Sequence, residues 1–250
     1  MKKIKISAVS YLNTLPFIYG ITHSEYLKKN CIIEIDYPSI CAEKLINNKV
    51  DISLTPVAAI PKSENYKIIS NYCIGAVGKV KSVILAGNVP FSEINNIYLD
   101  YQSKTSVVLI KIIAAKLWKI KPVWLQSGEG YENLIKNDSA GVIIGDRAIT
   151  LQKNYKYVYD LSEEWQKLTS LPFVFACWVS NKKIDSDFLF NFNSALEAGT
   201  KNIRNIESNI ISKQELYDYL TNNLNFNLDD IKTESINTFF TYIDELKLNC

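Results

Sequence analysis

The sequence predicts an α/β protein with largely parallel sheets. Strand-like apolar segments and helix-like amphipathic segments alternate along residues 3–180, the pattern of strands joined by crossover helices. Residues 185–250 differ, because their apolar spacing is helical throughout. A chain of 250 residues is long enough for one large domain or for two lobes of about 100–150 residues each.

The first strand is predicted at residues 3–9, and a helix at residues 17–29 follows it. Thr14 offers a hydroxyl that can cap this helix, and Pro16 would lie in the first turn, where a missing N–H is harmless. Asn13 therefore stands where a strand ends and a helix begins, a place at which free amides and the helix dipole attract anions. An ordinary capped turn is the alternative interpretation.

A second junction of this kind is predicted shortly afterwards. Strands at residues 32–37 and 50–54 flank a helix at residues 39–48. Thr55 is the expected N-cap of a further helix, since Pro56 would then hold its first position. Further strands are predicted at residues 66–70, 72–77 and 81–86.

Hydroxyl residues crowd a third junction. A strand is predicted at residues 96–100, and residues 107–118 are apolar almost all round, as in a buried helix. Ser103, Thr105 and Ser106 precede that helix. This combination suits a carboxylate or a phosphate, or it serves only as a cap.

The fourth junction follows a buried strand at residues 140–144. Gly145 allows a close backbone approach there, and Asp146 is placed to cap the next helix. The remaining predicted strands are residues 123–125, 157–161 and 172–180, and the remaining predicted helices are residues 131–137, 163–168, 187–206, 213–223 and 229–248. No strand is predicted after residue 185.

A breaker cluster, GNVP at residues 87–90, marks the predicted crossing into a second lobe. We therefore expect lobe I to comprise residues 1–87 plus 178–250, with the C-terminal helices packed on it. Lobe II would comprise residues 88–177.

Composition excludes several classes of partner. A net charge of +2 without a dense basic face argues against nucleic acid, and no apolar run is long enough for a membrane span. Residues 1–6 lack the apolar core of a signal peptide, so we expect a cytoplasmic protein. Five scattered cysteines without a Cys-x-x-Cys spacing indicate neither a zinc site nor a disulfide framework. We expect no metal and no cofactor, and the oligomeric state is not predicted.

Histidine chemistry is also disfavoured. His23 is the only histidine, and it lies in a polar stretch expected to be exposed. Histidine triads and histidine metal sites are therefore excluded. A dinucleotide-binding glycine fingerprint and a P-loop are both missing from the sequence, which argues against a nucleotide ligand.

The four junctions together predict a ligand cleft. In open α/β sheets, ligands bind beyond the carboxyl ends of the strands. Small polar groups and helix N-termini at those ends suit a compact anion with more than one carboxylate.

Five segments in order resemble the chorismate dehydratase family of the futalosine route to menaquinone. They are SYLNTLPF at residues 10–17, KSV at 81–83, SKTSV at 103–107, IGD at 144–146 and the stretch at 161–178. The resemblance spans about residues 4–180 and implies a two-lobed periplasmic-binding-protein-like (type II) fold with a central ligand cleft. It also implies dehydration of chorismate to 3-[(1-carboxyvinyl)oxy]benzoate, with no cofactor.

The resemblance also assigns roles to residues. Asn13 and Ser82 resemble a polar pair near the reacting carbon and the leaving hydroxyl, and are the expected catalytic residues. The expected substrate-binding residues are Tyr11, Thr55, Ser103, Thr105, Ser106, Gly145 and Asp146. The base that removes the C3 proton is either a carboxylate of the substrate itself or Asp146.

Two alternatives stay open. The first is the later enzyme of the same route, 1,4-dihydroxy-6-naphthoate synthase, which by resemblance uses a histidine in the second lobe. The second is a non-catalytic small-anion binding protein. Arg147 departs from the small residue often found after the IGD segment, and so leaves the local charge of the cleft open.

Overall fold

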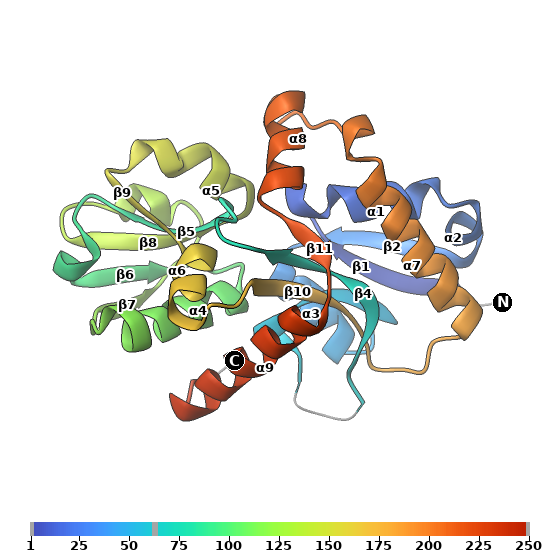
Figure 1. Ribbon diagram of the computed structural model, residues 1–250, viewed down its shortest axis with the longest axis horizontal. Helices are drawn as coiled ribbons and strands as arrows, with labels where there is room; N and C mark the ends of the chain where they lie inside the picture. Colours follow the sequence, from blue (N-terminus) through green and yellow to red (C-terminus); the bar gives the residue numbers. More distant parts are fainter. Residues whose placement is uncertain (1–2, 62–64, 249–250) are drawn as a thin grey trace. The chain divides into compact units, whose positions relative to one another are not determined.

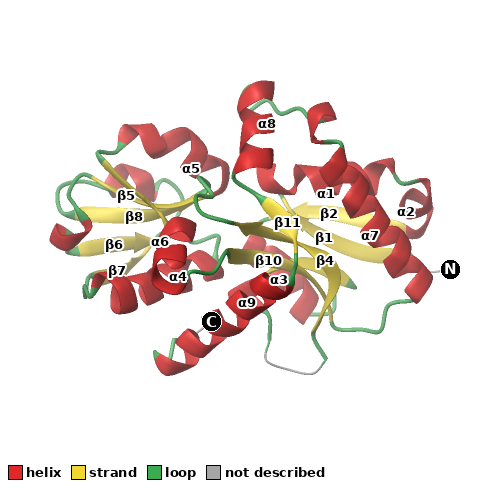
Figure 2. Ribbon diagram, viewed as in Figure 1, coloured by secondary structure: helices red, strands yellow, loops and turns green. Residues whose placement is uncertain are grey.

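The computed structural model describes residues 3–61 and 65–248, so Met1, Lys2 and Cys250, which entered the sequence argument, lie outside it. The chain forms two compact units, each built on one sheet (Figure 1, Figure 2). Unit 1 comprises residues 1–75 and 174–229, and unit 2 comprises residues 76–173 and 230–250. Within the described ranges, no helix is both long and apolar enough to cross a membrane.

Unit 1 holds a six-stranded sheet in the order β11-β4-β10-β3-β1-β2. Its strands are β1 (Ile4–Val9), β2 (Cys31–Asp36), β3 (Ile52–Pro56), β4 (Lys67–Ala76), β10 (Phe173–Ser180) and β11 (Asn225–Asn227). The neighbours β2, β1 and β3 are parallel, whereas β10 runs antiparallel to β3 and β11 antiparallel to β4. The predicted parallel pairing therefore holds for β1, β2 and β3, but not for β10 and β11.

The helices of unit 1 are α1 (Leu15–His23), α2 (Glu25–Asn30), α3 (Pro38–Ile46), α7 (Ser186–Lys201) and α8 (Lys213–Asn222). Helices α1 and α7 lie side by side (Figure 1) and cross at two glycines. A Cβ atom added at Gly20 would lie 1.9 Å from the Ala195 carbonyl oxygen, and one at Gly199 would lie 1.8 Å from that of Pro16. Because the opposing atoms belong to the backbone, only glycine permits this helix crossing.

Unit 2 holds a five-stranded sheet in the order β7-β6-β8-β5-β9. Its strands are β5 (Val83–Gly87), β6 (Asn96–Leu99), β7 (Val123–Gln126), β8 (Ser139–Ile144) and β9 (Tyr157–Asp160). Its helices are α4 (Lys104–Ile113), which continues into a π-helical turn (Ala114–Trp118), α5 (Gly145–Leu151), α6 (Leu161–Thr169) and α9 (Asp230–Glu245). Strands β7, β6 and β8 are parallel, and β5 is antiparallel to both β8 and β9, so this sheet is also mixed.

The two compact units divide the chain at other points than the predicted lobes. Strand β5, expected in the first lobe, pairs with β8 through Val83 and Ile144 in the second sheet. Helix α9, also expected in the first lobe, packs on unit 2, where the Trp165 and Phe239 rings lie 5.9 Å apart and the Trp165 indole donates to Ser235 Oγ at 3.1 Å. The breaker cluster at residues 87–90 marks only the turn after β5, whereas strand pairing between distant segments decides which unit a strand joins.

Three local predictions also need correction. The helix predicted at residues 17–29 is divided at Ser24, whose hydroxyl caps α2 by accepting from the Leu27 amide at 3.3 Å. The strands predicted at 66–70 and 72–77 form one continuous strand, β4. Strand β11 was not predicted, because its three residues stand between two helices and show no apolar alternation.

Candidate functional site

In unit 1 the predicted site residues gather at one edge of the sheet. Parallel strands β1 and β3 pair Ser7 with Ser53, so both strands end at the same edge. Tyr11 and Asn13 follow the end of β1, and Thr55 lies in the last residues of β3. Unit 1 therefore presents these three residues together at the carboxyl ends of neighbouring strands.

Neither threonine in this region caps a helix through its side chain, which corrects two predictions. Thr14 occupies the N-cap position of α1, but its hydroxyl donates to Asn13 Oδ1 at 3.1 Å. Thr55 lies inside β3, where its hydroxyl donates to the Ser53 carbonyl oxygen at 3.4 Å, and only a short 3₁₀ turn (Val57–Ala59) follows. The Thr14 hydroxyl thus orients the Asn13 carboxamide instead of closing the helix.

In unit 2 the remaining predicted residues also share one sheet edge. The Gly145 amide donates to the Ser82 carbonyl oxygen at 2.8 Å, so the start of β5 lies beside the end of β8. Strand β6 is parallel to β8, and the segment that leads into α4 follows β6. Ser82, the start of α4 and the Gly145–Asp146 turn are therefore neighbours at this edge.

The N-terminus of α4 is the best defined part of this edge. Ser103 is the N-cap, and its hydroxyl accepts from the Ser106 amide at 3.2 Å and lies 3.0 Å from the Ser106 hydroxyl. Thr105 and Ser106 are each only 1% exposed. Two serine hydroxyls thus lie together on the first turn of a ten-residue helix, at the positive end of its dipole.

Ser82 has an unusual environment. Its side chain is buried, and its hydroxyl has no hydrogen-bond partner among the described residues. Lys81 before it adopts a left-handed conformation with φ of 63°, and the Lys81 amide donates to Asp160 Oδ2 at 2.6 Å. An unpaired buried hydroxyl is costly to a fold, so its presence favours a functional interpretation.

Asp160 was not among the predicted site residues. Its carboxylate caps α6, accepting from the Ser162 and Glu163 amides at 3.0 and 3.3 Å, and also holds the Lys81 amide. Burial raises the pKa of Asp160 above its usual range, although the backbone amide donors oppose that rise. The sequence pattern placed Asp160 inside the strand predicted at residues 157–161, a position that carries no functional signal.

The fourth junction forms in a different way from the one predicted. Ile144, not Asp146, is the N-cap of α5, and Asp146 lies half-buried in the first turn. Gly145 has a φ of 62°, which explains the need for glycine at this point.

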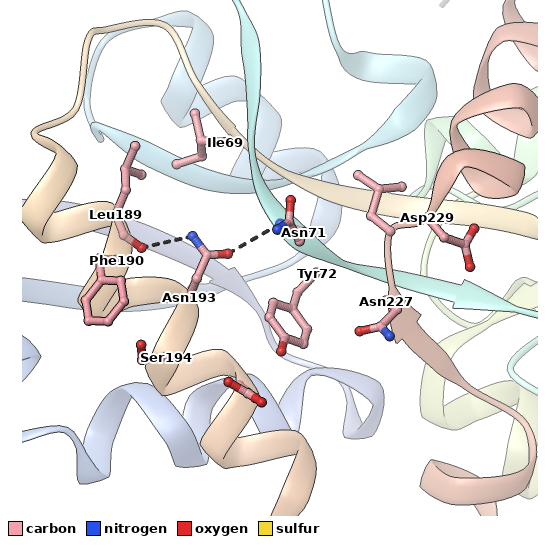
Figure 3. Close-up of a pocket in the computed structure, with 11 residues that line it drawn as sticks. Ile69, Asn71, Tyr72, Leu189, Phe190, Asn193, Ser194, Asn227 and Asp229 are labelled. Carbon is pink, nitrogen blue, oxygen red and sulfur yellow. Dashed lines mark hydrogen bonds between the residues drawn. The ribbon is translucent and has the colours of Figure 1, made fainter.

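A groove of about 750 Å³ in unit 1 contains none of the predicted site residues. It runs along β4, α7 and the segment after β11, as Figure 3 shows for Asn71, Asn193 and Asp229. Asn193 is engaged within the fold, since its Oδ1 accepts from the Asn71 amide at 3.3 Å and its Nδ2 donates to the Leu189 carbonyl oxygen at 2.9 Å (Figure 3). Across residues 3–61 and 65–248, no group of three His, Cys, Asp or Glu side chains is placed to hold a metal ion.

The two mixed sheets and their helices define a periplasmic-binding-protein-like fold. Protein AF1704 from Archaeoglobus fulgidus is similar over 99% of this chain and 98% of its own, with a TM-score of 0.77 and 13% identity. The Candida albicans CA3427 gene product, described as having the generic periplasmic binding protein fold, matches 100% of this chain and 92% of its own, with a TM-score of 0.64 and 13% identity. The aliphatic sulphonate binding protein SsuA from Escherichia coli matches 100% and 94%, with a TM-score of 0.59 and 12% identity.

Residues 4–245 match the family described as menaquinone biosynthesis, and the chain belongs to this family. Membership in that family implies an enzyme. The predictions of a menaquinone-pathway family and of a periplasmic-binding-protein-like fold are therefore confirmed.

Proposed function

We propose that this enzyme dehydrates chorismate to 3-[(1-carboxyvinyl)oxy]benzoate. Family membership supports a step of menaquinone biosynthesis, and the five sequence segments resemble chorismate dehydratase in particular. The observation that carries the proposal is the edge of the second sheet. There a capped helix N-terminus with two serine hydroxyls lies at the same edge as the buried, unpaired hydroxyl of Ser82. Such donors suit a carboxylate and a departing hydroxyl group.

The reaction removes one molecule of water from the substrate ring. The C3–H bond breaks and its electron pair forms a ring double bond, while the C4–O bond breaks. The departing hydroxide combines with the released proton. Since the product ring is aromatic, the elimination is strongly driven, and the protein has to bind the dianion, orient it and stabilise the developing charge.

The proposed roles follow from the resemblance and are consistent with the chemistry of each residue. Ser103, Thr105 and Ser106 hold a substrate carboxylate, because the amides and hydroxyls of a helix N-terminus stabilise negative charge. By resemblance, Asn13 of unit 1 and Ser82 of unit 2 are the proposed donors toward the reacting carbon and the leaving hydroxyl. Tyr11, Thr55, Gly145 and Asp146 are proposed, also by resemblance, as substrate-binding residues.

Two groups are candidates for the base at C3. One is the enolpyruvyl carboxylate of the substrate, and the other is Asp146, which lies half-buried in the first turn of α5. A pH–rate profile of Asp146→Asn separates them. Loss of most turnover would assign the base to Asp146, whereas a wild-type rate and profile would assign it to the substrate.

The position of the only histidine bears on the closest alternative. His23 lies in the last turn of α1, exposed and stacked on Tyr19 with ring centroids 3.9 Å apart. Unit 2 contains no histidine in its sequence. This favours chorismate dehydratase over 1,4-dihydroxy-6-naphthoate synthase, which by resemblance uses a histidine in the second lobe.

Incubation of the purified protein with chorismate tests the proposal. Ultraviolet absorbance should report the conversion of the cyclohexadiene to a substituted benzoate, and mass spectrometry should show the loss of one water. Saturable binding of chorismate without conversion would support the alternative of a non-catalytic anion-binding protein.

A further inference from the structure

A buried charge network lies beside the candidate site in unit 2. Arg147, in the first turn of α5, donates from Nη2 to Asp100 Oδ2 at 2.6 Å and to Gln102 Oε1 at 3.1 Å. Its Nη1 donates to Glu132. The Asp100 side chain is 0% exposed, and that of Arg147 is 28% exposed. A buried carboxylate of this kind requires a partner, and the planar guanidinium supplies it.

Asp100 holds the next part of the chain with its other oxygen. Asp100 Oδ1 accepts from the Gln102 backbone amide at 2.8 Å, while Oδ2 also accepts from the Tyr131 hydroxyl at 2.9 Å. Gln102 is therefore fixed twice, at its backbone by Asp100 and at its side chain by Arg147. Burial raises the pKa of Asp100, and the neighbouring guanidinium opposes the rise.

The network reaches both segments of the candidate site in unit 2. Gln102 directly precedes Ser103, the N-cap of α4. Arg147 directly follows the Gly145–Asp146 turn at the start of α5. One side chain thus connects the two segments that follow neighbouring strands β6 and β8.

The same contacts limit what else Arg147 can do. Two carboxylates, Asp100 and Glu132, and one amide oxygen already engage its guanidinium. Arg147 therefore adds no free positive charge at this sheet edge, since carboxylates of the protein neutralise it. Arg147 is not a free clamp for an anionic substrate.

We propose that Arg147 is a positioning residue, which holds the Gln102–Ser103 segment so that the N-terminal donors of α4 meet the substrate carboxylate. This rests on the proposed function for the identity of the ligand, but the positioning itself is independent of it. Loosening the segment should weaken substrate binding and leave the chemical step nearly intact, because the α4 donors hold the substrate equally before and during reaction.

Arg147→Lys tests this most sharply. Lysine keeps the charge, but one ammonium cannot reproduce the planar fork that contacts Asp100, Glu132 and Gln102 together. We expect KM for chorismate to rise about tenfold, the equivalent of one charge-assisted hydrogen bond, with kcat changing less than about threefold. Arg204→Lys is the matched control, since Arg204 is exposed in unit 1 and lies over the Tyr217 ring at 5.5 Å.

Amide hydrogen exchange gives a readout that needs no substrate. Peptides covering residues 100–107 should exchange faster in Arg147→Lys than in the wild type, and at the wild-type rate in Arg204→Lys. Gln102→Ala, which removes the side-chain contact and leaves the ion pairs in place, should move both readouts in the same direction by less. It also provides the test if Arg147→Lys does not fold.

The outcomes separate the two proposals. Unchanged exchange at residues 100–107 in both Arg147→Lys and Gln102→Ala would overturn the positioning role. So would a large fall in kcat with KM unchanged, because Arg147 would then act on the reacting atoms. A wild-type protein that leaves chorismate unconverted would overturn the proposed function, and the exchange comparison would then decide the positioning role alone.

Discussion

Polar groups near the ends of the strands have different hydrogen-bond environments in the two units. In unit 1, β1 and β3 lead into 3₁₀ turns, and the Thr14 and Thr55 hydroxyls bond to nearby oxygens of the same segment. In unit 2, β6 leads into a ten-residue helix whose first turn is capped by Ser103, and Ser82 keeps an unpaired buried hydroxyl. Unit 1 thus has an oriented carboxamide at Asn13, whereas unit 2 has a capped helix N-terminus and an unpaired buried hydroxyl.

The largest expected effect concerns turnover in Asn13→Ala and Ser82→Ala. Each removes a donor proposed to act near the reacting carbon, so turnover should fall roughly 100- to 1000-fold, or about 3–4 kcal/mol. The two variants should differ in their free energy of unfolding. Since the Ser82 hydroxyl has no partner among the described residues, its removal should leave the free energy of unfolding unchanged or raise it by up to about 1 kcal/mol.

Chorismate turnover and denaturant unfolding of both variants check this prediction. A wild-type rate in Asn13→Ala would remove that residue from the mechanism. A marked loss of stability in Ser82→Ala would show that the hydroxyl has a structural partner.

The next effect concerns packing. Gly20→Ala in unit 1 should lower the free energy of unfolding by about 3 kcal/mol, because the new Cβ would lie 1.9 Å from a backbone oxygen of α7. Gly87→Ala in unit 2 is the milder comparison, since its new Cβ would lie 3.1 Å from the Ala140 Cβ and needs a shift of only a few tenths of an ångström. Chemical denaturation should place Gly87→Ala within about 1 kcal/mol of the wild type. Equal losses in both variants would contradict the close crossing of α1 and α7.

A smaller effect tests the two predicted caps directly. Ser103→Ala should lower stability by about 1 kcal/mol through loss of the cap and should also raise KM for chorismate. Thr55→Val should cost less than about 0.5 kcal/mol, because Thr55 lies in a strand and caps nothing. Denaturation midpoints of the two variants measure these losses. A larger loss of stability in Thr55→Val than in Ser103→Ala would contradict the position of Thr55 in a strand and support the predicted helix cap.

The last effect is small at neutral pH and concerns the buried thiols of unit 1, which contains every cysteine of the described chain. Burial raises the pKa of Cys41 to about 12 from an ordinary 9.0, with a hydrogen bond from Ser7 opposing the rise. The folded state keeps this thiol protonated, so its contribution to stability is complete below pH 9 and is lost as the pH rises toward 12.

Thiol labelling at pH 9, followed by peptide mass spectrometry, measures this effect. Cys41 should react far more slowly in the native protein than in denaturant, and Gly20→Ala should accelerate its labelling more than Gly87→Ala does. Fast labelling of Cys41 in the native wild type would contradict its buried position.

The sequence predicted most strands and helices because apolar spacing is a local property. Ser103 was recognisable because a serine before a long apolar helix has few other roles. Thr55 was misread for a related reason: a proline after a threonine suits a helix start, yet Pro56 ends a strand that pairs with β10 at Ala176. Tertiary pairing overrode the local signal.

Contacts between distant segments could not be predicted in this way. Arg147 and Asp100 lie 47 positions apart, and only the parallel pairing of β6 and β8 brings their segments to the same sheet edge. The membership of β5 in the second sheet has the same origin. Asp160 was predicted only as part of a strand, and its contact with the Lys81 amide depends on the left-handed turn before Ser82.

The most direct test of the proposed dehydration is the fate of chorismate mixed with the wild-type protein. We expect catalytic, multiple-turnover release of a product lighter by one water, with the absorbance of a substituted benzoate. Chorismate recovered intact after prolonged incubation with folded protein would contradict it.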